Sequence, residues 1–325
     1  MKNILISGGA GYLGTELTKD LLKNYNVIVY DKFYFRWIKK NKNKIINNNR
    51  LRLIEKNIDE INIKDFKDID IVCDLNGIPN DPSSEIDPKY TWNTNYKGRL
   101  KFAKIAKKAG VKRYIFNSTC SVYGFNEETV YENSKKNPLS SYAKANLKAE
   151  VEIFKLKNKT FKVNVLRNST LFGFSSTLRL DLVINIFVYN LLKNKKITID
   201  GNGEQYRPFI SIIDICNIYK KIIKTEEMPS FISNVVAFNS NIKKLALKVC
   251  SILKKDKRLI NFKATTKDHR SYIVESSNFN KYFNRFKYCT LKSQVLSLRK
   301  NIIKERVKMD ENTIRLKFYK KKLKN

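Results

Sequence analysis

Histidine and cysteine are scarce in this chain of 325 residues. Its single histidine, His269, cannot build a histidine-based metal cluster, which needs several such side chains. The five cysteines lie far apart, contain no Cys-x-x-Cys pair, and are odd in number, so they do not suit a disulfide framework or a zinc site. We therefore expect reduced thiols and no metal.

Long hydrophobic runs are also missing. No stretch approaches the roughly 18 consecutive apolar residues that a membrane-spanning helix needs. The first residues pass directly into a short apolar run at Ile4 to Ile6, which leaves no room for a signal peptide. We expect a cytoplasmic protein without a membrane partner.

Acidic residues are few. There are 30 aspartates and glutamates against 65 lysines and arginines, which gives a net charge of +35. Such an excess often points to nucleic acid or an anionic membrane as a partner. Lysine, asparagine and isoleucine are used heavily throughout, however, as in the low-complexity stretch 39–50. We interpret the excess as a compositional bias that would favour an anionic small substrate, and we expect no nucleic-acid partner.

The first 31 residues carry a pattern that is typical of dinucleotide binding. An apolar run suits a buried parallel strand, three glycines follow, and apolar residues then repeat at helical spacing from Tyr12 to Leu22. The tight turn needs residues without Cβ, and the N-terminus of the helix attracts a pyrophosphate. Asp31 ends the next apolar run, where a carboxylate binds ribose hydroxyls and disfavours the 2′-phosphate of NADP. The predicted cofactor is NAD, and its predicted contacts are Gly8, Gly11, Tyr12, Leu13, Gly14 and Asp31.

Apolar runs alternate with helical patterns through the first half of the chain. Strands are predicted at 51–54, 69–73, 113–116 and 163–166, and the clearest helices at 96–109 and 141–156. This alternation indicates an α/β fold of Rossmann type, with a doubly wound parallel sheet that binds ligands at the carboxyl ends of its strands. We expect an NAD-binding domain at 1–166, to which 209–236 returns, and a smaller, discontinuous substrate-binding lobe at 167–208 and 237–325.

Several segments, in order, resemble one known superfamily. The strand at 113–116 runs into Asn117-Ser-Thr-Cys-Ser-Val-Tyr-Gly124, and a helix opens near Ser140-Ser-Tyr-Ala-Lys-Ala-Asn146. With the glycine turn, these segments resemble the extended short-chain dehydrogenases/reductases, and within them the NAD-dependent nucleotide-sugar epimerases and dehydratases. The stretches 70–77, 95–98, 166–173, 176–185, 201–209 and 268–272 resemble other parts of that family, so the likeness covers nearly the whole chain.

The resemblance implies a catalytic set. In that family a tyrosine takes a proton from a sugar hydroxyl while NAD oxidises the sugar, and a serine or threonine bonds the same hydroxyl. Tyr142 and Thr119 match these two positions. The family's lysine, four residues after the tyrosine, lowers the tyrosine's pKa, but here Asn146 stands there, on the same helical face. Tyr131-Glu-Asn-Ser-Lys135 has the same spacing, yet it precedes the helix and is interpreted as a coincidence.

The residues next to Tyr142 and Thr119 limit which of the family's reactions we expect. Asn146 can bond a ribose hydroxyl but brings no charge, so we expect a higher tyrosine pKa, weakened catalysis and an alkaline optimum. Family dehydratases carry an Asp-Glu pair after the threonine, where this chain has Cys120 and Ser121, which disfavours elimination of water. The resemblance therefore favours epimerisation of a nucleotide-diphosphate sugar through a transient keto intermediate. A nucleotide-sugar reductase or dehydrogenase and a catalytically degenerate NAD-binding protein remain as alternatives.

The resemblance also implies contacts with adenine and with the substrate. Arg207 and Arg270 are the expected diphosphate ligands, because arginine suits bidentate phosphate contacts. Asn57 and Ile58 match the pair that contacts adenine, and Asn185 matches a position that bonds the diphosphate. Family members commonly form homodimers through two helices per subunit, which here would be the two helices predicted above.

Overall fold

The centre of the molecule is a seven-stranded sheet in which all neighbouring strands are parallel. The computed structural model describes residues 1–264 and 271–323. The strand order is β11-β7-β5-β4-β1-β2-β3, which reverses between β1 and β4, where such sheets bind ligands. The strands are β1 (Asn3–Ser7), β2 (Asn26–Asp31), β3 (Leu51–Glu55), β4 (Ile71–Asp74), β5 (Arg113–Thr119), β7 (Lys162–Asn168) and β11 (Phe231–Val235). The predicted Rossmann-type fold is confirmed.

These strands form where the sequence supplies apolar side chains for both faces of a sheet. In β1, Ile4 and Ile6 belong to one hydrophobic core and Leu5 belongs to the other, and all three are fully buried. Successive side chains of a strand point to opposite faces, so a continuous apolar run is what a sheet covered on both sides requires.

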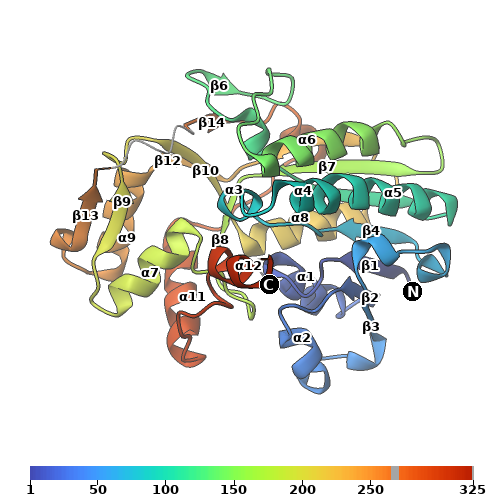
Figure 1. The fold of residues 1–325 in the computed structure, drawn as a ribbon, viewed down its shortest axis with the longest axis horizontal. Coiled ribbons are helices and arrows are strands. Elements are labelled where there is room, and N and C mark those ends of the chain that lie inside the picture. Colours follow the sequence, from blue (N-terminus) through green and yellow to red (C-terminus); the bar gives the residue numbers. More distant parts are fainter. Residues whose placement is uncertain (265–270, 324–325) are drawn as a thin grey trace.

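Helices cover both faces of the sheet (Figure 1). On one side, α1 (Tyr12–Leu21) packs beside α8 (Ile212–Lys224). On the other side, α4 (Pro88–Trp92), α5 (Arg99–Lys108) and α6 (Ser141–Phe154) pack together. The helix predicted at 96–109 begins as a π-helical turn, Asn93–Gly98, that continues into α5.

A second group of elements lies to one side of the sheet, on the left in Figure 1. It holds the three-stranded sheet β12-β10-β8, the pair β9-β13, and three helices that pack on one another. The elements are β8 (Thr170–Phe172), β9 (Ile197–Asp200), β10 (Tyr206–Ser211), β12 (Phe238–Asn241), β13 (Ile260–Lys263), α7 (Val183–Leu192), α9 (Ile242–Leu253) and α11 (Leu291–Lys304). The segment 209–236 divides between the two groups, because β10 joins the small sheet whereas α8 packs on α1 and β11 joins the large sheet.

Short elements complete the chain. They are β6 (Thr129–Val130), which pairs with β14 (Ile273–Val274), and α2 (Trp37–Lys40), α3 (Asp81–Ser84), α10 (Phe279–Tyr282) and α12 (Arg315–Leu323). Helix α12 returns the end of the chain to its first half, where Phe318 packs against Tyr34 and Phe35. Within residues 1–264 and 271–323, no helix has the length and apolar character needed to cross a membrane.

Candidate active site

A cavity of about 560 Å³ opens over the carboxyl ends of the central strands. The segments after β1, β2, β4, β5 and β7 bound it, so residues that are far apart in the sequence share one space. It brings together most of the predicted site residues, namely Gly8, Gly11, Tyr12, Leu13, Gly14, Asp31, Asn57, Thr119, Tyr142, Asn146 and Arg207. Ile58 and Asn185 are buried and do not line it, and Arg270 lies outside the described residues.

The turn between β1 and α1 requires glycine for two separate reasons. Gly8 has a φ of +72°, in the left-handed region that side chains disfavour. A Cβ at Gly14 would lie 2.5 Å from the carbonyl oxygen of Gly8, closer than the two atoms can approach. Helix α1 then begins after Gly11 without a side-chain cap, which leaves N–H groups of its first turn available to an anion. This geometry fits the pyrophosphate of a dinucleotide.

Asp31 stands at the end of β2, on the wall of the cavity. Its carboxylate accepts hydrogen bonds from the backbone N–H groups of Ala10 (3.0 Å) and Phe33 (2.7 Å). Burial raises the pKa of the Asp31 carboxyl to about 6, although both hydrogen bonds favour the charged form. A further donor, such as a ribose hydroxyl, would stabilise the carboxylate at neutral pH.

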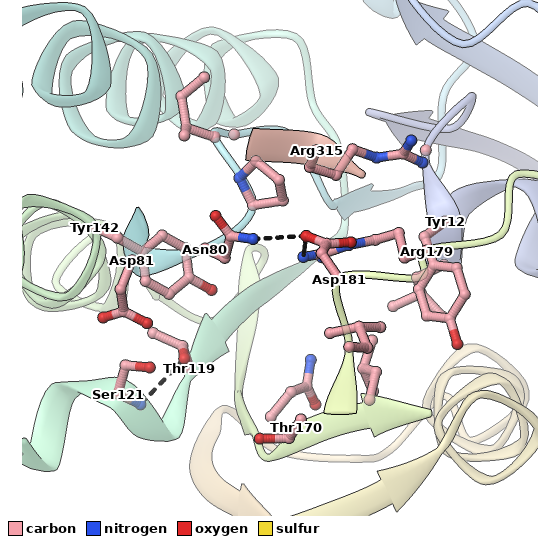
Figure 2. A pocket seen from close by; sticks show the side chains of 18 of the residues that line it. Tyr12, Asn80, Asp81, Thr119, Ser121, Tyr142, Thr170, Arg179, Asp181 and Arg315 are labelled. Atoms are coloured by element: carbon pink, nitrogen blue, oxygen red, sulfur yellow. Dashed lines mark hydrogen bonds and ion pairs between the residues drawn. The ribbon is translucent and has the colours of Figure 1, made fainter. Parts of the chain in front are cut away.

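Tyr142 and Thr119 reach the cavity from neighbouring elements. Thr119 ends β5, and its Oγ1 accepts a hydrogen bond from the N–H of Ser121 (3.1 Å). Tyr142 lies in the first turn of α6, which the hydroxyl of Ser140 caps by accepting from the N–H of Ala143 (3.1 Å). Burial raises the pKa of Tyr142, and its hydrogen bond with the Thr119 side chain counteracts that rise. Figure 2 shows the two side chains together on one wall of the pocket.

Asn146 lies one helical turn after Tyr142 and is buried. Its Nδ2 donates to the carbonyl oxygen of Tyr142 (2.8 Å), and its Oδ1 accepts from Nη1 of Arg99 (2.8 Å). Arg99, the first residue of α5, is only 2% exposed and also lines the cavity. Nothing in the sequence marks Arg99 as a site residue, because an arginine in so basic a chain is expected to be a solvated surface charge. The neutral amide of Asn146 is thus in direct contact with a buried cation.

A second group of charged side chains lies in the middle of the pocket (Figure 2). Arg179 binds Asp181 through Nε and Nη2 (3.1 and 2.8 Å), and Nδ2 of Asn80 donates to the same carboxylate (2.8 Å). Burial alone would raise the pKa of Asp181, but the ion pair with Arg179 lowers it. Arg207, on β10, lines the cavity with its guanidinium 5.8 Å from the ring of Tyr272.

Asn185, on α7, takes part in the protein's own hydrogen bonding. Its Oδ1 accepts from the N–H of Gly173 (2.9 Å), and its Nδ2 donates to the hydroxyl of Tyr12 (3.1 Å) and to the carbonyl oxygen of Arg179 (2.9 Å). Both ends of the amide are therefore engaged within the fold. The structure places Asn185 behind the wall that carries Arg179, where it supports that wall.

Helix α12, near the end of the chain, also bounds the cavity, and no pattern in the sequence connects it with the site. Arg315 and Tyr319 line the cavity, as Asp31 does. Arg315 is 2% exposed, its Nη2 donates to the carbonyl oxygen of Thr177 (3.1 Å), and its guanidinium lies 3.5 Å from the ring centre of Phe35. Burial lowers the pKa of this guanidinium to about 10. No carboxylate in the described part of the chain forms an ion pair with it.

Comparison with known proteins identifies the family. Residues 4–235 match the model of the NAD dependent epimerase/dehydratase family. The chain belongs to this family. The expected family and its cofactor, NAD, are thereby confirmed. Among the relatives of this epimerase/dehydratase family member is the uncharacterized UDP-glucose epimerase YtcB of Bacillus subtilis, which is 28% identical over 262 residues, or 77% of this chain and 80% of YtcB.

Two solved structures share the fold of this family member over most of its length. The UDP-N-acetylglucosamine 4-epimerase of Methanobrevibacter ruminantium, in complex with UDP-N-acetylmuramic acid, has a TM-score of 0.83 at 22% identity, over 94% of this chain and 99% of that one. The UDP-glucuronic acid 4-epimerase of Bacillus cereus, in complex with UDP-glucuronic acid and NAD, has a TM-score of 0.81 at 22% identity, over 93% and 99%. At this identity the likeness shows the common fold.

Proposed function

We propose that this protein epimerises a nucleotide-diphosphate sugar by reversible oxidation with bound NAD. The observation that carries the proposal is the position of Tyr142 and Thr119 in the same cavity as the glycine turn and Asp31. One part of the cavity suits a dinucleotide, and another presents a buried phenol with a hydroxyl beside it. The Bacillus cereus epimerase of this fold was solved with both NAD and a UDP-sugar, which supports the same division here.

NAD fits the part of the cavity between the glycine turn and α12. The chemistry that bound NAD supplies is oxidation of a sugar carbon and then reduction of the keto sugar. The first turn of α1 offers N–H groups to the pyrophosphate, and Asp31 offers a carboxylate to the ribose hydroxyls. Arg315 bonds to Thr177, whose hydroxyl donates to the carbonyl oxygen of Gly11 (2.9 Å). Because a buried cation without a carboxylate partner is stabilised by an anion, we assign Arg315 to the pyrophosphate as well.

Tyr142 is the proposed base. Its oxygen takes the proton of a sugar hydroxyl while that carbon is oxidised, and it returns the proton after the keto sugar has turned its other face. Thr119 bonds the same hydroxyl, and its hydrogen bond with Tyr142 favours the charged phenolate. The cycle ends in the protonation state in which it began and consumes no cofactor.

The residues after Thr119 argue against elimination of water. Cys120 is 1% exposed, does not line the cavity, and donates through Sγ to the carbonyl oxygen of Arg167 (3.1 Å). Burial raises the pKa of its thiol. Ser121 lines the cavity, but a hydroxyl is a poor acid and a poor base. Neither side chain replaces the carboxyl groups that a dehydratase uses.

For the substrate, the proposal is a nucleotide-diphosphate sugar held beyond Tyr142. Arg207 lines this part of the cavity and is the proposed diphosphate ligand among the described residues. Arg270, the second arginine expected there, lies outside them. The pair of Arg179 and Asp181 stands between the two parts and can bond to either molecule.

The proposal is tested by incubating the protein with NAD and a panel of UDP-, GDP-, CDP- and dTDP-sugars and following the sugars by NMR. At least one sugar should convert into its epimer while the amount of NAD stays constant. A keto-deoxy sugar would identify a dehydratase, and NADH formed in proportion to product would identify a dehydrogenase. Binding of NAD without conversion of any sugar would identify a protein that has lost the chemistry.

A further inference from the structure

Each nitrogen of the Arg99 guanidinium, next to Asn146, donates at least one hydrogen bond within the protein. Arg99 donates from Nε to Oδ2 of Asp74 (2.9 Å), from Nη1 to Oδ1 of Asn146 (2.8 Å), and from Nη2 to the carbonyl oxygens of Asp74 and Asn117 (both 3.0 Å). Its guanidinium carbon also lies 3.8 Å from the ring centre of Phe116. The guanidinium is therefore fixed by contacts within the fold.

Asp74 determines how this ion pair is oriented. Its side chain is fully buried at the end of β4, where it accepts hydrogen bonds from the hydroxyls of Ser7 (2.8 Å) and Tyr114 (2.7 Å). Arg99 and Asn146 line the cavity, whereas Asp74 does not. The positive end of the pair therefore faces the cavity, and the negative end is turned away from it.

Asn146 joins this cation to the helical turn that carries the proposed base. It accepts from Arg99 through Oδ1 and donates to the carbonyl oxygen of Tyr142 through Nδ2. A lysine at position 146 would place a second positive charge beside a guanidinium that is already buried, and like charges at this distance repel strongly. An asparagine accepts the hydrogen bond that Arg99 offers, so the neutral residue suits this neighbour.

We propose that Arg99 is a positioning residue of the active site, which supplies from α5 the positive charge that the family places on α6 and which orients Asn146 next to Tyr142. This inference rests on the proposed function, because it concerns the charge around the proposed base. It also changes the meaning of Asn146. Asn146 accepts a hydrogen bond from the arginine that takes over the charge of the family's lysine. The loss of that lysine therefore need not weaken catalysis.

Several charged groups act on Tyr142, so the test has to isolate Arg99. Burial has the largest effect and raises the pKa of Tyr142, Asp81 raises it further, and Arg179 and Arg99 lower it. The groups to keep unchanged are therefore Asp81 and Glu85 in the segment 81–85 and Arg179 with its partner Asp181.

The experiment removes the ion pair as a unit, because removal of Arg99 alone would leave a buried carboxylate without its partner. The variants are Asp74→Asn with Arg99→Met, the same double variant with Asn146→Lys added, and Asn146→Lys alone. Tyr142 is followed by ¹⁹F NMR in protein labelled with 3-fluorotyrosine, with and without NAD, and Tyr142→Phe identifies its signal. The titration needs no turnover, so its outcome is independent of whether a sugar is epimerised.

We expect the titration midpoint of Tyr142 to rise by about one pH unit in the double variant and to return when Asn146→Lys is added. Asn146→Lys alone should lower Tm and should not raise kcat, because Arg99 already provides the charge. An unchanged midpoint in a folded double variant would overturn the inference. If the double variant does not fold, the single variant Asn146→Lys tests the inference instead. A higher kcat with an unchanged Tm in that variant would show that Arg99 does not supply the charge. A midpoint that shifts as expected, in a protein that converts no sugar, would refute the proposed function and leave the role of Arg99 standing.

Discussion

Nη1 of Arg99 lies 2.8 Å from Oδ1 of Asn146, and both side chains line the cavity that Tyr142 enters. The two residues are 47 positions apart and belong to different helices, α5 and α6. Asn146 replaces the family's lysine, but it is hydrogen-bonded to a buried arginine. The positive charge is therefore still present next to the asparagine. The fold therefore keeps a buried positive charge in the cavity of the proposed base.

Replacement of Tyr142 by Phe should lower turnover steeply and leave the cofactor bound. The phenol oxygen is the proposed proton acceptor, and loss of a general base lowers the rate by about 10²–10⁴-fold. The matched control is Tyr131→Phe, because Tyr131 belongs to the second Tyr-x-x-x-Lys sequence but is 39% exposed and does not line the cavity. Initial rates and NAD affinity are measured for both variants. Equal rates for the two would remove Tyr142 from the mechanism.

The affinity for NAD should depend on pH through Asp31. Its pKa is raised by burial from 3.8 to about 6, and ribose hydroxyls donate more strongly to the charged form than to the neutral one. The Kd for NAD should therefore be constant above about pH 7 and rise by up to about tenfold for each pH unit below 6. Calorimetric titration across this range measures it. Asp31→Asn should bind more weakly than the wild type above about pH 6, should approach it below that pH, and should show no such dependence itself. A wild-type Kd that stays constant down to about pH 5 would contradict the assignment.

The contribution of Asp31 to folding stability falls as the pH rises, whereas that of most carboxyl groups increases. Because the pKa of Asp31 is higher in the folded chain than its ordinary value of 3.8, the fold binds the proton more tightly than the unfolded chain does. Asp31 thus contributes stability below about pH 4, and this contribution is lost as the pH rises to about 6. Above that pH, Asp31→Asn should unfold at a higher Tm than the wild type when NAD is absent.

Arg315→Gln should weaken the binding of NAD by about tenfold, because a charged hydrogen bond to the pyrophosphate is lost. Its control is Lys320→Gln, which removes the same charge from an exposed position of the same helix. The fold itself should tolerate Arg315→Gln, since the arginine is a buried charge without a carboxylate partner in the described part of the chain. Equal NAD affinities for the two variants would show that Arg315 does not bind the cofactor.

The expected homodimer stays a prediction. The charges on the surfaces of α5 and α6 should make its formation depend on salt. Lys101, Lys104 and Lys108 are exposed on α5, and Lys144 and Lys148 are exposed on α6. Two such faces repel each other unless salt screens them, so the dimer fraction should rise between about 0.05 and 0.5 M NaCl. Sedimentation equilibrium measures that fraction. A monomer at every salt concentration would rule out the helix-mediated dimer.

The sequence was sufficient where structure depends on local pattern. The glycine turn and the strands around it lie within a strand–turn–helix unit whose spacing is visible in the chain. Thr119 and Tyr142 could be named because their segments resemble the family. The family resemblance then aligned them on one cavity. Asp31 could likewise be predicted as a cavity residue, because the end of β2 necessarily opens beside the turn after β1.

The side chains that the sequence could not place are those whose partners are remote. Nothing near Arg99 distinguishes it from its many basic neighbours, and only the packing of α5 on α6 shows that it is buried. Arg315 meets Thr177 across 138 positions, after the chain has passed through the second group of elements. Asn185 was a reasonable ligand by resemblance, but the orientation of α7 turns its amide toward Gly173 and Tyr12. Burial and long-range pairing, which a linear pattern does not encode, decided all three.

The fate of the hydrogen on the inverted carbon tests the proposed epimerisation most directly. A nucleotide sugar deuterated at every carbon of the hexose is converted in ordinary water, and the product is analysed by NMR and mass spectrometry. Reversible oxidation at Tyr142 predicts that the epimer keeps all of its deuterium, because the hydrogen removed from the carbon is returned to it without exchange. Replacement of the deuterium at that carbon by solvent hydrogen would contradict the mechanism, since it would show that the carbon itself had been deprotonated.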